Sequence, residues 1–143
     1  MRSTARTPER GQALVEFSLA LIVFLMLLMA IFDLGRGIYM FNGVAQAARE
    51  IARVTSNHPG TTLGNSTQTA GVVATQKSLI PNLQNPTFAC VDIDNTAVVG
   101  TCQPGMRVKV TITAPYGPVT PVMGLLGTWT MSSNSSVEIS VEQ

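Results

Sequence analysis

Hydrophobic residues are concentrated near the start of the chain, in one long block. From Phe17 to Phe32 there are sixteen residues without a charge, and Ser18 is the only polar one. As an α-helix this block is about 24 Å long, and a helix that begins at Gln12 reaches about 31 Å, close to the hydrocarbon thickness of a bilayer. The segment therefore spans a membrane only if Glu16, near one edge, is included.

Two other kinds of segment, a secretory signal and the core helix of a soluble protein, can also contain such an apolar block. A secretory signal needs small residues at alternating positions near its cut, and residues 29–34 (MAIFDL) contain no such pattern. A soluble core helix normally has a polar face, and a domain this small could not surround sixteen apolar residues. We therefore predict a permanent membrane helix. Arg2, Arg6 and Arg10 place its N-terminal side in the cytoplasm by the positive-inside rule, so the rest of the chain is exported.

The helical pattern continues beyond the block. Apolar residues recur at steps of three and four, which predicts one face of a helix. These residues are Leu34, Ile38, Phe41, Ala45, Ala48 and Ala52. The helix should extend to about Thr55 and end at His58-Pro59-Gly60, because proline blocks continuation and glycine permits the turn.

Asp33 and Arg36 follow the apolar block and are three residues apart. On a helix they could pair. Because they lie where the helix leaves the bilayer, a simple interfacial anchor is the favoured interpretation, and contact with other components is the alternative.

The second half of the chain predicts a short helix and several strands. Residues 70–80 have a weak helical pattern, and residues 87–93 are rich in β-forming residues. Residues 106–113 alternate strictly, which is typical of a half-buried antiparallel strand. Pro115, Gly117, Pro118 and Pro121 should end this strand. Residues 129–131 and 137–141 suggest closing strands, with a turn or bulge at residues 132–134. A long helix on a small antiparallel sheet is an α+β fold.

Composition and cysteine spacing limit the function. Charged residues make up only 12% of the 143 residues and the net charge is +1, which argues against a disordered chain and against nucleic-acid binding. Cys90 and Cys102 form either a disulfide, if they are outside the cytoplasm, or two unpaired thiols. His58 is the only histidine. We expect no catalytic residue, no metal site and no cofactor.

The start of the apolar block resembles the processing site of prepilins in type IV pilus-like systems. It reads RGQALVEF, from Arg10 to Phe17. In that family a membrane peptidase cuts after a glycine, an acid occupies the fifth position of the mature chain, and phenylalanine often follows. Gly11, Gln12, Glu16 and Phe17 fit these positions. The resemblance implies a cut between Gly11 and Gln12.

Cleavage would also supply a partner for Glu16. The new amine on Gln12 would lie four residues before Glu16, which is about one helical turn. A carboxylate near a helix N-terminus is favoured by the helix dipole. In a filament, the amine of a neighbouring subunit could take the same role. The alternative is an acid that only reaches up to the lipid headgroups.

Together with the segment that follows, FDLGRGIYMFNGVAQAAREIAR, the chain resembles the TadE/TadG-like family of minor-pilin-like proteins (pseudopilins) in the tight-adherence, or Flp, pilus system. The resemblance covers about residues 10 to 55. The matching positions after the membrane block are Asp33, Gly35, Arg36, Tyr39, Ala47, Ala48, Arg49, Ala52 and Arg53. The proline that family members often have early in the block is missing, near Leu21 and Ile22.

The resemblance implies a pilin-like α+β fold and a structural, non-enzymatic role in pilus assembly and surface attachment. We expect a leader at residues 1–11, a transmembrane helix at 12–34, an amphipathic extension at 35–56 and an exported α+β domain at 57–143. The expected partners are a prepilin peptidase, other pilins or pseudopilins, the assembly platform and the bacterial inner membrane. The alternative is a membrane-anchored binding or adhesin module that is not processed as a pilin.

Overall fold

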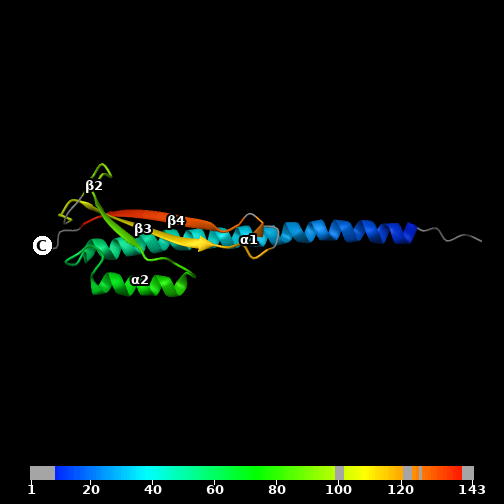
Figure 1. Cartoon of the computed structure of the whole chain (residues 1–143), viewed down its shortest axis with the longest axis horizontal. Helices are drawn as coiled ribbons and strands as arrows, with labels where there is room; N and C mark the ends of the chain where they lie inside the picture. The colour runs from blue at the N-terminus through cyan, green and yellow to red at the C-terminus, as the bar shows by residue number, and fades with distance from the viewer. Residues whose placement is uncertain (1–8, 99–101, 121–123, 126, 140–143) are drawn as a thin grey trace, which may run out of the picture.

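One unbroken helix, α1, runs from Glu9 to Asn57. The structure, a computed structural model, describes residues 9–98, 102–120, 124–125 and 127–139. With 49 residues, α1 is about 73 Å long at the α-helical rise. Its N-terminal half extends alone and its C-terminal half lies in the folded domain (Figure 1). The predicted end is confirmed, since the helix stops immediately before His58 and Pro59.

The rest of the described chain contains a second helix and a four-stranded antiparallel sheet. Helix α2 spans Thr67–Leu79, and the strands are β1 (Thr87–Val91), β2 (Ala97–Val98), β3 (Arg107–Tyr116) and β4 (Trp129–Glu138). Their order in the sheet is β2-β1-β3-β4. The predicted α+β class is therefore confirmed.

The domain is built in three layers around the C-terminal half of α1. One side of this half packs on β3 and β4, and α2 packs on the helix from another side (Figure 1). Small residues on α1 let the sheet approach closely, and the alternating side chains of β3 face them. The buried residues at this contact are Val44, Ala47, Ala48, Ile51, Ala52, Val108, Val110, Ile112 and Ala114. The predicted alternation of the 106–113 strand is therefore confirmed.

Helix α2 is held against α1 by a small buried polar cluster. The hydroxyl of Ser66, the residue before α2, accepts a hydrogen bond from the backbone N–H of Thr69 at 3.1 Å and caps the helix. The Thr69 hydroxyl lies 3.2 Å from that of Thr55 on α1. Both threonines are fully buried. The cap thus also joins the start of α2 to the end of α1.

The strand boundaries correct two expectations. β3 continues through Pro115, which was expected to break it. Beyond Thr111, β3 has lost its β1 neighbour and pairs only with β4. Proline is tolerated at such an edge because a missing N–H need not cost a ladder bond.

The expected turn at residues 132–134 is also wrong. These residues lie in the middle of β4, where Ser132 pairs with Thr113 and Asn134 pairs with Thr111. A ten-residue partner strand thus imposes a strand on a serine-rich segment of low β-propensity. Residues 140–141 of the expected closing strand lie outside the described residues.

The predicted apolar face of α1 is correct only in its second half. Ala48 and Ala52 are buried, whereas Leu34, Ile38 and Phe41 are largely exposed. The sheet and α2 bury a strip of α1 that includes Val44 and Ile51 instead. The exposed apolar residues therefore lie beside the end of the sheet, where the domain meets the bare half of the helix.

Candidate functional site

The residues of the predicted processing site lie in the first turns of α1. The helix begins at Glu9, so the peptide bond between Gly11 and Gln12 is part of it. Gly11 is exposed, and a Cβ atom at this position would meet no other atom within 4 Å. A peptidase could approach the backbone from any side, after unwinding the first helical turns.

Glu16 and Phe17 project from the bare part of the helix. Glu16 borders a shallow surface strip lined by Leu19, Ala20, Val23, Phe24 and Leu27. Within the part of the chain that the structure describes, its carboxylate makes no hydrogen bond or ion pair. The site therefore combines an acid with apolar neighbours, which is costly in lipid unless a cation is supplied.

The bare half of α1 is long and apolar enough to cross a membrane, judged by length and composition. None of the most apolar stretch is buried by the folded domain. Its large side chains from Leu14 to Phe32, except the half-buried Leu28, are exposed on all sides of the helix. A surface of this kind needs lipid or other helices around it, because water would solvate it poorly. The N-terminal helix thus has the length, composition and exposure that a membrane anchor requires.

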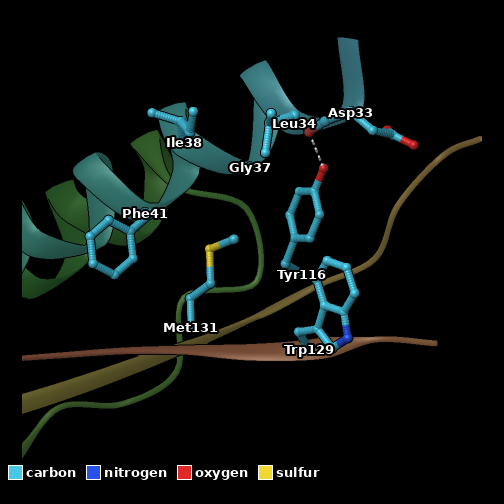
Figure 2. Close-up of a pocket in the computed structure, with 8 residues that line it drawn as sticks. All are labelled: Asp33, Leu34, Gly37, Ile38, Phe41, Tyr116, Trp129 and Met131. Atoms are coloured by element: carbon cyan, nitrogen blue, oxygen red, sulfur yellow. Dashed lines mark hydrogen bonds between the residues drawn. The ribbon is translucent and has the colours of Figure 1, made fainter. Parts of the chain in front are cut away.

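Asp33 ends the apolar block and is held by the loop between β3 and β4. Its side chain is only 5% exposed. The backbone N–H groups of Val119 and Thr120 donate to its two carboxylate oxygens at 3.2 and 3.0 Å, and the Thr120 hydroxyl donates to the same carboxylate. The Tyr116 hydroxyl donates to the backbone carbonyl of Asp33 at 2.7 Å (Figure 2). The loop therefore fixes the folded domain to one point on the helix.

The expected pairing of Asp33 with Arg36 is not found among the described residues. The Arg36 guanidinium carbon instead lies 5.4 Å from the centre of the Tyr116 ring, in a cation–π contact. Asp33 is turned toward the loop because the loop offers three donors, two of them backbone N–H groups that would otherwise be unpaired. Asp33 thus makes a tertiary contact with the loop, and its expected role as an interfacial anchor remains a prediction.

An apolar cleft lies between α1 and the end of the sheet at the same level. Its volume is about 270 Å³. Leu34, Ile38 and Phe41 come from the helix, and Trp129 and Met131 come from β4 on the opposite side (Figure 2). The Trp129 ring stacks on Tyr116, with ring centres 6.5 Å apart. The cleft is open and continuous with the exposed residues of α1.

The remaining sequence candidates lie away from this junction. Cys90 on β1 and Cys102 are joined as a disulfide. On the exposed side of α1, Arg53 donates to Glu50 at 2.8 Å. This hydrogen bond lowers the pKa of Glu50 and raises that of Arg53. Both residues are solvent-exposed enough for the pair to contribute little to stability.

Sequence analysis missed the contact between Asp33 and the β3–β4 loop. The donors come from residues 86 and 87 positions later in the chain, so no local spacing reveals them. One signal was present: an acid that directly follows an apolar block must find donors if it is buried. The backbone of a loop is a common source of such donors.

Comparison with known proteins identifies the N-terminal segment. Residues 11–53 match the family model described as TadE-like protein. The match begins at the glycine of the predicted cut and ends on the packed half of α1, so the resemblance found in the sequence is confirmed over this segment. This family is a structural rather than enzymatic family of the tight-adherence pilus system. No curated protein and no solved structure matches the chain.

Proposed function

We propose that this chain, with its TadE-like N-terminal segment, is a minor pilin-like structural subunit (pseudopilin) of a tight-adherence pilus system. It is made as a precursor, cut between Gly11 and Gln12 by a prepilin peptidase, and held in the inner membrane by residues 12–34. The N-terminus is cytoplasmic, and the domain of residues 57–143 is exported on the extension formed by residues 35–56. The subunit then assembles with other pilins and the assembly platform.

The observation that carries this proposal is an exposed apolar helix with one acid near its start, in a segment that matches the TadE-like family from Gly11 onward. The folded domain covers the second half of α1 and leaves the first half bare (Figure 1). The bare half is therefore available for lateral packing against the helices of other subunits. A catalytic role would need a group of polar side chains, and from Ala13 to Phe32 the helix offers only Glu16 and Ser18.

Cleavage creates an amine with which the Glu16 carboxylate can pair. The new amine on Gln12 lies about 6 Å along the helix axis from Glu16, and an α-amino group with a pKa near 8 is mostly protonated at neutral pH. The two groups can neutralise each other, or each can pair with a neighbouring subunit. Pairing between subunits would set the stagger of adjacent helices, because each charge in lipid has a single nearby partner.

Mass spectrometry of the protein purified from its own membranes tests the cut. A chain that begins at Gln12 supports the proposal. A chain that keeps Met1 to Gly11 supports the alternative, a membrane-anchored binding or adhesin module that is not processed.

A matched pair of glycine variants sharpens this test. Gly11→Leu should make the precursor accumulate, because a bulky side chain would obstruct the peptidase. Gly35→Leu is the control, since Gly35 lies on the same helix and is equally free of neighbouring atoms; it should be cut normally. Normal cutting of Gly11→Leu would contradict the proposed site.

A further inference from the structure

Exposed apolar side chains of the folded domain gather at one end. Beyond α1, five large apolar side chains are exposed among the described residues: Leu79, Ile93, Val119, Leu125 and Trp129. Val119 and Leu125 lie between β3 and β4, and Trp129 is the first residue of β4. Val119 is 74% exposed, Leu125 is 88% exposed and Trp129 is 43% exposed.

The same region carries no charge. All sixteen residues from Tyr116 to Met131 are uncharged, in a sequence that includes two prolines and three glycines between its apolar residues. A loop that faces water or a polar protein surface normally carries some charged residues. An uncharged loop with exposed apolar side chains fits a lipid surface better.

The position of this region along α1 is fixed by hydrogen bonds. Asp33 directly follows the apolar block and binds the backbone N–H groups of Val119 and Thr120. The Tyr116 ring reaches from the Asp33 carbonyl to Gly37, where a Cβ atom would lie 3.6 Å from it. The loop therefore lies within about one helical turn of the end of the apolar block. In Figure 1 the described residues at this end of β3 and β4 lie beside α1 where the helix leaves the sheet.

From this geometry we propose that the β3–β4 end of the domain lies in the lipid headgroup layer on the exported side of the inner membrane, with lipid as its partner. The contact residues are Val119, Leu125 and Trp129, together with Leu34 and Ile38 beside the apolar cleft. A tryptophan at this level is a typical interfacial anchor, because its ring is apolar and its N–H remains hydrated. The proposal rests on the membrane insertion of α1 proposed above.

The apolar cleft supports lipid rather than solvent at this position. Its walls are the side chains of Leu34, Ile38 and Phe41 on one side and Trp129 and Met131 on the other. Its single acid, Asp33, directs its carboxylate to the loop and not into the cleft (Figure 2). Lipid that surrounds Phe32 would meet this cleft without crossing a polar boundary.

Trp129 provides a direct test because it is the only tryptophan of the chain. The full chain would be reconstituted in vesicles of phosphatidylcholine and phosphatidylglycerol and recovered by flotation after carbonate extraction. Its fluorescence would then be quenched either by acrylamide in water or by lipids that carry a nitroxide at a shallow or a deep position. We expect strong quenching by the shallow nitroxide, weaker quenching by the deep one, and severalfold less acrylamide quenching than for the control.

The control moves the reporter to the other end of the sheet. Ile93 is 72% exposed and lies next to the Arg107 end of β3; that end is about 30 Å from Tyr116 at the rise of a strand. In the double variant Trp129→Phe, Ile93→Trp, acrylamide should quench the fluorescence and neither lipid should. A second variant, Val119→Ser with Leu125→Ser, keeps the backbone bonds to Asp33 and should lower the lipid quenching of Trp129.

Each other outcome is decisive. A chain that does not float overturns the membrane insertion of α1 and this inference with it. A chain that floats, with Trp129 quenched by acrylamide and not by lipid, overturns this inference alone. Protection of Trp129 from both quenchers also overturns it, because protein rather than lipid would then cover the site.

Discussion

Replacing Tyr116 by phenylalanine removes one hydroxyl group and leaves the ring in place. In the wild type this hydroxyl donates to the Asp33 carbonyl at 2.7 Å, and Tyr116 is only 3% exposed. The stacking on Trp129 and the contact with Arg36 involve the ring, so they should survive. The variant therefore isolates one buried hydrogen bond between the folded domain and α1.

The expected loss follows from the burial of this bond. A buried hydrogen bond contributes about 1 kcal/mol net to stability. Loss of that amount lowers the melting temperature by about 4 °C for a folded unit of roughly 100 residues. It also makes local opening of the β3–β4 loop about fivefold more frequent, if the loop opens without global unfolding.

Two measurements on the full chain in detergent micelles check these values: thermal unfolding, and hydrogen exchange of the peptides that contain Val119 and Thr120. The matched control is Tyr39→Phe, at the only other tyrosine, which lies on the exposed surface of α1. It should change stability by less than about 0.5 kcal/mol. Equal effects of the two substitutions would refute the idea that the Tyr116 hydroxyl holds the domain on the helix.

Two further predictions concern the acid in the membrane and the disulfide. The Glu16→Leu variant should insert into the membrane and be cut normally but lose incorporation into assembled structures. The Glu16→Asp variant keeps the charge and should retain part of this incorporation. If Glu16→Leu assembles like the wild type, pairing of the acid with the amine is unnecessary. Replacing Cys90 and Cys102 together by serine should lower the free energy of unfolding by about 3 kcal/mol. A reductant should then have no further effect on stability. If the reductant destabilises this variant as much as the wild type, the reductant does not act through the bond between the two cysteines.

The features that sequence patterns predicted are those set by neighbours along the chain. The apolar block, the end of α1 before His58 and Pro59, and the alternation of residues 108–112 all depend on local periodicity or backbone chemistry. The strand through Pro115 could not be predicted, because proline is tolerated there only where β1 no longer pairs with β3.

The candidate site also contains residues that local sequence could indicate and contacts that it could not. Gly11 and Glu16 are predicted from the resemblance of one contiguous segment, Arg10 to Phe17, to prepilin processing sites, and they remain predictions. The contact of Asp33 with the loop was not found, because it joins residues that are 86 and 87 positions apart. The sequence near Asp33 offers Arg36 as a possible partner, and a simple interfacial anchor was the favoured interpretation of the two residues. The donors of the β3–β4 loop bind the buried carboxylate of Asp33 in place of Arg36, because an ion pair exposed to solvent would contribute little.

The contact at Asp33 also sets the depth of Glu16 in the proposed orientation. Asp33 follows Glu16 by 17 positions, which correspond to about 26 Å of helix, while the hydrocarbon core is about 30 Å thick. If the loop holds Asp33 at the outer boundary, an upright helix places Glu16 about 4 Å inside the inner boundary. Gln12 then lies about 32 Å from Asp33, at the headgroups. The acid is therefore held within lipid by a contact on the opposite side of the membrane, and the amine that cleavage creates is the nearest cation of its own chain that can reach it.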